Sequence, residues 1–181
     1  MDTVRYFKDL AKAQLRQSRL DGAATLGLQK MQHQVAVNAG FRSWDDLLAA
    51  PESERELVVL MDREPSLNMF GFGPGDFART REERMKNMVE WRRELRAGGR
   101  VQEIRTWIVD NLDSRKTINQ WAGSYGLKHL AEQDLGYVAN GEFIAAAILE
   151  GYPYRRDSSG PNATFGMSER SISAIRKRQR G

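Results

Sequence analysis

Two side chains have the types and the spacing that proton transfer or metal binding would need. His129 and Glu132 are three residues apart, which places them on one face of a helix, where they could share a proton or a metal ion. The only other histidine is His33, which has no carboxylate at a fixed spacing, and cysteine is absent. Neither histidine belongs to a known ligand motif. We therefore expect no metal ion, no cofactor and no enzymatic activity, with a small metal-dependent enzyme using His129 and Glu132 as an alternative.

The glycine-rich stretch at residues 71–75, GFGPG, could be mistaken for a phosphate-binding loop. It lacks the Lys and Ser/Thr that such a loop uses, and Pro74 removes a backbone N–H that would face the phosphate. We interpret the stretch as a turn.

Residues 152–156, YPYRR, combine aromatic and cationic side chains, which can stack on bases and hold phosphates. A packed loop with two solvated arginines is an equally good interpretation. The helix expected at 81–97 also carries cations interleaved with glutamates, a pattern more typical of a salt-bridged surface. The residues that we expect to contact nucleic acid are Lys128, Tyr152, Tyr154, Arg155, Arg156, Arg92, Arg93 and Arg96, with Arg176, Lys177, Arg178 and Arg180 of the C-terminal segment.

The excess of positive charge is confined to the C-terminus. The chain has a formal net charge of +4, and residues 168–181 hold five cations and one anion, which leaves 23 basic and 23 acidic residues elsewhere. A neutral body with a basic tail favours a weak electrostatic contact with phosphate over a broad DNA-binding face. A solvated terminus is the alternative.

Residues 124–156 have the outline of a helix-turn-helix: a helix ending at Gly136, then a second helix over 141–150 that Asn140 would cap. The second helix, GEFIAAAILE, is apolar on nearly every face and so must be buried. It has no side chain that reads bases, and Glu142 would repel a phosphate. We predict that it belongs to the core.

Apolar residues recur at helical spacing in most segments, and the alternation typical of strands is nearly absent, which predicts an all-α protein. We expect helices over 2–20, 26–40 and 44–50, and from the capping-box motif at 53–56 to about Met61. A second capping-box motif at 80–83 begins the longest helix, which extends to about Ala97, and residues 101–112 form a further helix. A third capping-box motif lies at 117–120.

The expected organisation has two helical modules. A small three-helix module covers residues 1–51, a short helix and a Gly/Pro-rich linker cover 52–78, a C-terminal helical module covers 79–167, and a basic tail covers 168–181. The longest apolar run, 143–149, is too short to cross a bilayer. We therefore expect a soluble cytoplasmic protein without a membrane partner.

Residues 5–50 resemble the short helical module that is labelled glyoxalase-related. The shared pattern is AxxxGFxSWxxL, which here is Ala36, Gly40, Phe41, Ser43, Trp44 and Leu47. The label implies a metal-dependent lyase. We do not infer that activity, because glyoxalases are rich in β-structure and bind metal through His and Glu.

Residues 114–172, which include SYGLKHLAE, YVANGEFIAAAI and GMSERSI, resemble a segment of uncharacterised proteins from bacterial mobile elements and phages. The resemblance implies a role in a plasmid, phage or integrated element and supplies no mechanism.

We therefore expect a non-enzymatic, nucleic-acid-associated accessory or regulatory protein of such an element, with DNA or RNA as partner. The alternative is a protein-binding module that inhibits a host factor or a defence protein. The sequence does not indicate an oligomeric state.

Overall fold

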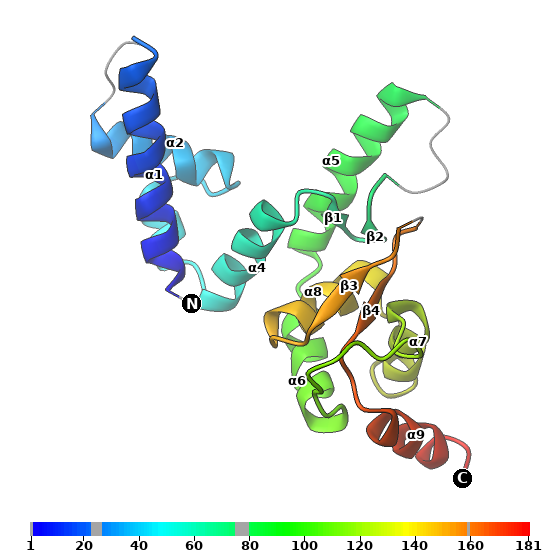
Figure 1. Cartoon of the computed structure of the whole chain (residues 1–181). Coiled ribbons are helices and arrows are strands. Elements are labelled where there is room, and N and C mark those ends of the chain that lie inside the picture. The colour runs from blue at the N-terminus through cyan, green and yellow to red at the C-terminus, as the bar shows by residue number, and fades with distance from the viewer. Residues whose placement is uncertain (1, 23–26, 75–79, 159) are drawn as a thin grey trace. The chain divides into compact units, whose positions relative to one another are not determined.

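The computed structural model describes residues 2–22, 27–74, 80–158 and 160–181 (Figure 1). The chain is mostly helical, as the hydrophobic periodicity predicts, and the described residues also form two small antiparallel sheets. Two compact units are present, residues 1–62 and 63–181. This division differs from the boundaries expected after residues 51 and 78.

The described residues of unit 1 form the helices α1 (Thr3–Leu20), α2 (Leu28–Asn38), α3 (Trp44–Ala49) and α4 (Glu52–Arg63), the last of which ends one residue beyond the unit. α4 belongs here, and not to a linker, because Val58 and Val59 join the same buried cluster as Phe7 of α1, Val35 of α2 and Leu47 of α3.

The turn after α2 depends on Gly40, whose φ of +83° is a conformation that favours glycine. It allows the Phe41 N–H to donate to the Ala36 carbonyl at 2.9 Å, and the Phe41 ring meets Phe7 edge-on. Ser43 then accepts from the Asp46 N–H at 3.0 Å and begins α3. Local hydrogen bonds and packing thus account for the spacing of Ala36, Gly40, Phe41 and Ser43 in this turn.

Unit 2 contains the remaining elements: β1 (Leu67–Asn68), β2 (Gly71–Phe72), α5 (Arg81–Ala97), α6 (Val101–Asn111), α7 (Ser124–Leu135), α8 (Asn140–Leu149), β3 (Tyr154–Arg156), β4 (Ala163–Phe165) and α9 (Glu169–Arg178). The capping box predicted at 80–83 is present, with Thr80 and Glu83 exchanging hydrogen bonds at 3.1 Å.

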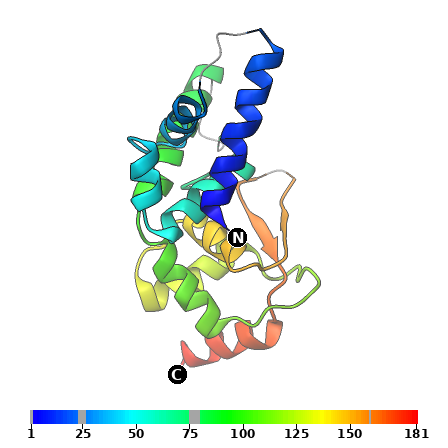
Figure 2. The same ribbon diagram turned by 90° about the vertical axis from the view of Figure 1, so that its left-hand side faces the viewer.

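Helix α8 is the core of unit 2. Residues 140–147 are all buried, and the helix packs against α6 and α7 (Figure 2). Three consecutive alanines, 145–147, allow this close approach. Glu142 is also buried, and burial raises the pKa of its carboxyl, which accepts a hydrogen bond from the Ala139 N–H at 3.1 Å. The prediction that this helix belongs to the core is confirmed.

The segment expected to be a linker instead forms the β1–β2 hairpin, which packs on α5 and α8. The hairpin is held from within by Asn68, whose side chain donates to the Gly73 carbonyl at 2.6 Å and accepts from the Phe70 N–H at 2.9 Å. It is fixed to α8 by the Gly141 N–H, which donates to the Met69 carbonyl at 2.9 Å. The final part of the expected linker, residues 75–79, lies outside the described residues.

The pairing of β3 with β4 is the other departure from an all-α fold. Tyr154 pairs with Phe165 and Arg156 with Ala163, so each strand has three residues. The motif at 117–120 does not begin a helix, because this segment hydrogen-bonds to the chain around β4: Asn119 N–H donates to the Phe165 carbonyl at 2.9 Å. Helix α7 starts only at Ser124.

The basic C-terminal segment forms a packed helix. In α9, Ile172 and Ile175 are buried, and the helix contacts α6. No helix in the described part of the chain is long and apolar enough to span a membrane.

Candidate nucleic-acid interface

The two tyrosines of the YPYRR stretch face into unit 2. Tyr152 is buried, and its hydroxyl donates to the Leu112 carbonyl. The Tyr154 hydroxyl donates to the carboxylate of Glu64. Burial and then this hydrogen bond raise the pKa of Tyr154 to about 12. The Tyr152 ring is buried, and the half-buried Tyr154 ring already lies parallel to the Phe72 ring, with centres 6.4 Å apart, so neither ring is a free platform for a base.

The two arginines of the same stretch differ. Arg156 lies over the Phe72 ring, with its guanidinium carbon 4.3 Å from the ring centre, and contacts Glu64 and Ser66. It therefore fixes β3 to the segment that leads into the hairpin. Arg155, the next residue back, is exposed and makes no side-chain hydrogen bond or ion pair within the described ranges.

The arginines of α5 also divide into different roles. Arg92 donates to the carbonyls of Glu64, Pro65 and Leu67 at 2.8 to 3.2 Å, so its charge stabilises the start of unit 2. Arg93 is exposed, and Arg96 is half-buried. Beyond the helix, Arg100 binds the carbonyls of Leu135 and Tyr137.

The four cations at the end of α9 remain at the surface, and two of them are paired. Arg178 donates to Asn111 and to Asp134, each at 3.0 Å, and Arg176 lies 3.5 Å from the carboxylate of Glu169. The side chains of Lys177 and Arg180 are exposed and have no hydrogen-bond or ion-pair partner in the part of the chain that the structure describes.

Lys128 is buried, with 7% of its surface exposed, and lies at the centre of a polar network on α7. Its ammonium donates to Glu132 at 2.8 Å. Burial alone would raise the pKa of Glu132, but hydrogen bonds from Lys128, the Val138 N–H and His129 outweigh burial and lower it. Because its charge is already balanced, Lys128 is a poor phosphate ligand.

The lysine is flanked by exposed aromatic rings that the sequence analysis did not select. The Lys128 ammonium lies 5.4 Å from the centre of the Tyr125 ring and 5.5 Å from that of Tyr137. The Tyr125 ring also meets His129 edge-on, with centres 4.6 Å apart. We call Tyr125, Lys128, His129 and Tyr137 the aromatic patch.

The rings of the aromatic patch are open to solvent. Tyr125 is 58% exposed and Tyr137 is 71% exposed, while Trp121, in the turn before α7, is 80% exposed. A signal for Tyr125 was present in the sequence: with His129 it occupies the face of α7 opposite to the buried Leu127 and Ala131, where a polar side chain is usual.

The basic end of α9 lies beside α7. The Gln179 side chain donates to the Leu130 carbonyl at 2.9 Å, and Arg178 reaches Asp134 one turn further along the same helix. These bonds place Lys177 and Arg180 on the helix end that adjoins α7. The structure thus places the basic end of α9 against α7, the helix that also carries Tyr125 and Lys128.

The candidate metal pair is in contact, as its spacing predicts, since a ring nitrogen of His129 meets the Glu132 carboxylate. No group of three or more potential His, Cys, Asp or Glu ligands occurs among the described residues. The contacts with Lys128 and Val138 give Glu132 a structural role in holding the end of α7.

No protein-family model matches the chain, and comparisons with curated proteins and with solved structures found no significant match. The resemblances of residues 5–50 and 114–172 therefore stay predictions.

Proposed function

We propose that this protein is a non-enzymatic, nucleic-acid-associated accessory or regulatory protein of a bacterial mobile element or phage. Its contact surface on unit 2 is the aromatic patch together with the cations Lys177 and Arg180. The ligand is a single strand, whose bases are free to stack on exposed rings.

The observation that carries the proposal is the exposure of Tyr125 and Tyr137, whose ring centres lie 5.4 and 5.5 Å from the same Lys128 ammonium group. Exposed aromatic rings can each stack a base of any sequence, and cations close to them can follow the phosphates. Each ring already contacts the Lys128 ammonium, which reduces the side-chain entropy that is lost when a base stacks on it.

A single strand is favoured over a base-reading contact with duplex DNA by the burial of α8. The second helix of the helix-turn-helix outline has Phe143 and Ile144 fully buried and so cannot enter a groove. Stacking needs no such helix. The neutral body agrees with an affinity that depends on stacking more than on net charge.

The test is a fluorescence-anisotropy titration of the full chain with labelled single-stranded DNA, single-stranded RNA and duplex DNA at several salt concentrations. We expect tighter binding to the single strands. Tyr125→Ala and Tyr137→Ala should each weaken it about tenfold, since stacking contributes about 1–3 kcal/mol per base. Leu20→Ala, at an exposed position of unit 1, serves as the surface control.

The cations are tested through the salt dependence. Neutralising both Lys177 and Arg180 to Gln should reduce the slope of log affinity against log salt by about 1.4, because each phosphate contact on a single strand contributes about 0.7. Arg170→Gln is the matched control, since Arg170 is exposed at the opposite end of α9. Absence of binding at low salt, or equal binding by the tyrosine variants, would refute the proposal.

A further inference from the structure

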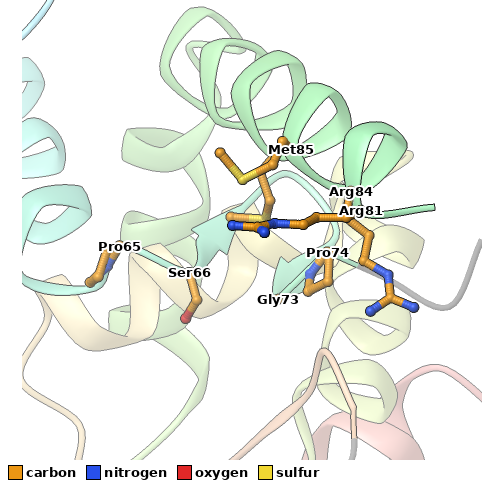
Figure 3. Close-up of a pocket in the computed structure, with 8 residues that line it drawn as sticks. Pro65, Ser66, Gly73, Pro74, Arg81, Arg84 and Met85 are labelled. Atoms are coloured by element: carbon orange, nitrogen blue, oxygen red, sulfur yellow. The ribbon is translucent and has the colours of Figure 1, made fainter. Parts of the chain in front are cut away.

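A pocket of about 440 Å³ lies between α5 and the β1–β2 hairpin, within unit 2 (Figure 3). Helix α5 supplies one wall, and the segments on either side of the hairpin supply the other. The described residues that line it are Pro65, Ser66, Gly73, Pro74, Arg81, Arg84, Met85 and Met88.

The hairpin wall of the pocket is organised before any ligand binds. The Gly73 N–H donates to the Ser66 carbonyl at 2.8 Å, which holds the two flanking segments together. From below, the Asn68 side chain contacts the Met88 sulfur at 3.4 Å. Arg92 fixes α5 to the chain that enters the hairpin. A ligand would therefore meet a formed surface and would not have to order it.

The lining has an apolar floor and a cationic edge. Two methionines and two prolines provide flexible and rigid apolar contacts, respectively, and methionine is common at surfaces that accept peptides of varied shape. Met85 is 63% exposed, and Val89, one turn further along α5, is 69% exposed, so apolar surface continues beyond the pocket. Arg81 and Arg84 stand on the same wall, and none of the described lining residues is acidic.

We propose that this pocket binds an acidic peptide segment of a partner protein, in which a large apolar side chain stands beside a carboxylate. The apolar side chain lies on Met85 and Met88, and the carboxylate faces the guanidinium of Arg81, which is exposed at the edge. The open side of the pocket, where Met85 meets solvent, suits a chain that continues past it. A small ligand would instead need to be enclosed on most sides.

This inference is independent of the nucleic-acid interface, since it uses none of the residues of the aromatic patch or of α9. Variants at the pocket therefore separate the two proposals: Met85→Lys should weaken peptide binding and leave the affinity for labelled single strands unchanged.

The experiment is a selection from a displayed library of random peptides on the full chain, with the Met85→Lys chain used to remove peptides that bind elsewhere. Enriched peptides are then synthesised with a fluorescent label and titrated by anisotropy. We expect enriched peptides to carry a large apolar residue next to Asp or Glu. Met85→Lys should weaken the binding of these peptides more than about tenfold, because the peptide's apolar side chain loses the contact that buries it.

The charge is tested with a matched pair of variants on α5. Arg81→Glu should weaken the binding of the selected peptides about fivefold, which is the size of effect expected for an exposed ion pair. Arg93→Glu makes the same change at an exposed position that does not line the pocket and should have no effect. Changing the peptide's Asp or Glu to Asn or Gln should reproduce the loss in the unchanged chain.

Three results would overturn the proposal: no enrichment over the Met85→Lys chain, enrichment of peptides without acidic residues, or equal binding by Arg81→Glu and Arg93→Glu. Self-association of the full chain that Met85→Lys abolishes, measured by sedimentation velocity in the absence of enriched peptides, would assign the surface to a second copy instead.

Discussion

The contact between Gly141 of α8 and the β1–β2 hairpin leaves no room for a side chain. A Cβ atom at position 141 would lie 1.8 Å from the carbonyl oxygen of Asn68 and 2.8 Å from the carbonyl carbon of Met69. The neighbours are backbone atoms, which cannot rotate away as a side chain can. Gly141→Ala must therefore displace the hairpin from α8 and break the hydrogen bond between the Gly141 N–H and the Met69 carbonyl.

The cost can be worked out against a glycine in open surroundings. Gly126 of α7 has nothing within 4 Å of a Cβ, so Gly126→Ala should stabilise unit 2 by about 0.5–1 kcal/mol through helix propensity alone. Overpacking at Gly141 should cost about 1–3 kcal/mol, and a backbone clash of this depth belongs at the upper end. The two variants should differ by about 3–4 kcal/mol in the free energy of unfolding.

The assay is urea denaturation at equilibrium, followed by tryptophan fluorescence. Trp44 is the tryptophan of unit 1, and Trp44→Phe in every chain leaves only the tryptophans of unit 2 to report. Equal midpoints for Gly141→Ala and Gly126→Ala would refute the close packing of hairpin and helix, and with it the formed wall of the pocket.

Two further predictions concern ionisable groups. Glu132→Gln should destabilise unit 2 by about 2 kcal/mol, because the buried Lys128 ammonium loses its carboxylate, while adding Lys128→Met should recover most of the loss in the same urea titration. Since the pKa of Glu132 is lowered in the fold, its contribution should be complete above its unfolded value of about 4.3 and lost as the pH falls through the folded pKa. Tyr154, with its pKa raised to about 12, should contribute stability that is complete below pH ~10 and lost as the pH rises toward that value. Burial also raises the pKa of Tyr152, so ultraviolet difference titration should show late phenolate formation by both tyrosines, and Tyr154→Phe should remove one of the two; an unchanged late amplitude would contradict the contact with Glu64.

The sequence predicted the helices well where the local signal was complete. Thr80 and Glu83 form the expected capping box, and Gly40 takes the positive φ expected of a helix-ending glycine. The apolar stretch around Phe143 is the buried helix that its composition required. Each of these features depends on residues within one or two turns of one another.

The features that the sequence did not predict depend on distant partners. β3 and β4 have three residues each, too few for alternation to be recognised, and β3 exists because Tyr154 pairs with Phe165. The segment at 117–120 has a helix-starting motif, yet its backbone bonds to the chain near Phe165. Tertiary contacts outweigh local preference in both places.

The candidate contact residues also depended on distant partners that local sequence patterns did not reveal. Lysines and arginines are usually exposed, so Lys128, Arg92 and Arg156 were natural choices for phosphate contacts. Lys128 and Glu132 are four residues apart on a helix, a spacing at which opposite charges pair, but the sequence analysis assigned Lys128 to nucleic acid and did not use this signal. Nothing local showed that Arg92 would meet three carbonyls near residue 65, or that the rings of Tyr125 and Tyr137 would both contact one lysine.

The bonds that join Glu64 and Ser66 to Tyr154 and Arg156 have a consequence for the order of folding. They connect residues 90 or more positions apart, and α6, from the middle of the chain, packs against α9 at the end. Unit 1 is a compact unit formed by residues 1–62. During synthesis, unit 1 can form as soon as it leaves the ribosome, whereas the first residues of unit 2 must wait for nearly the last. Until then the apolar surfaces of α8 and the hairpin lack part of their cover, which makes unit 2 the more aggregation-prone part of the nascent chain.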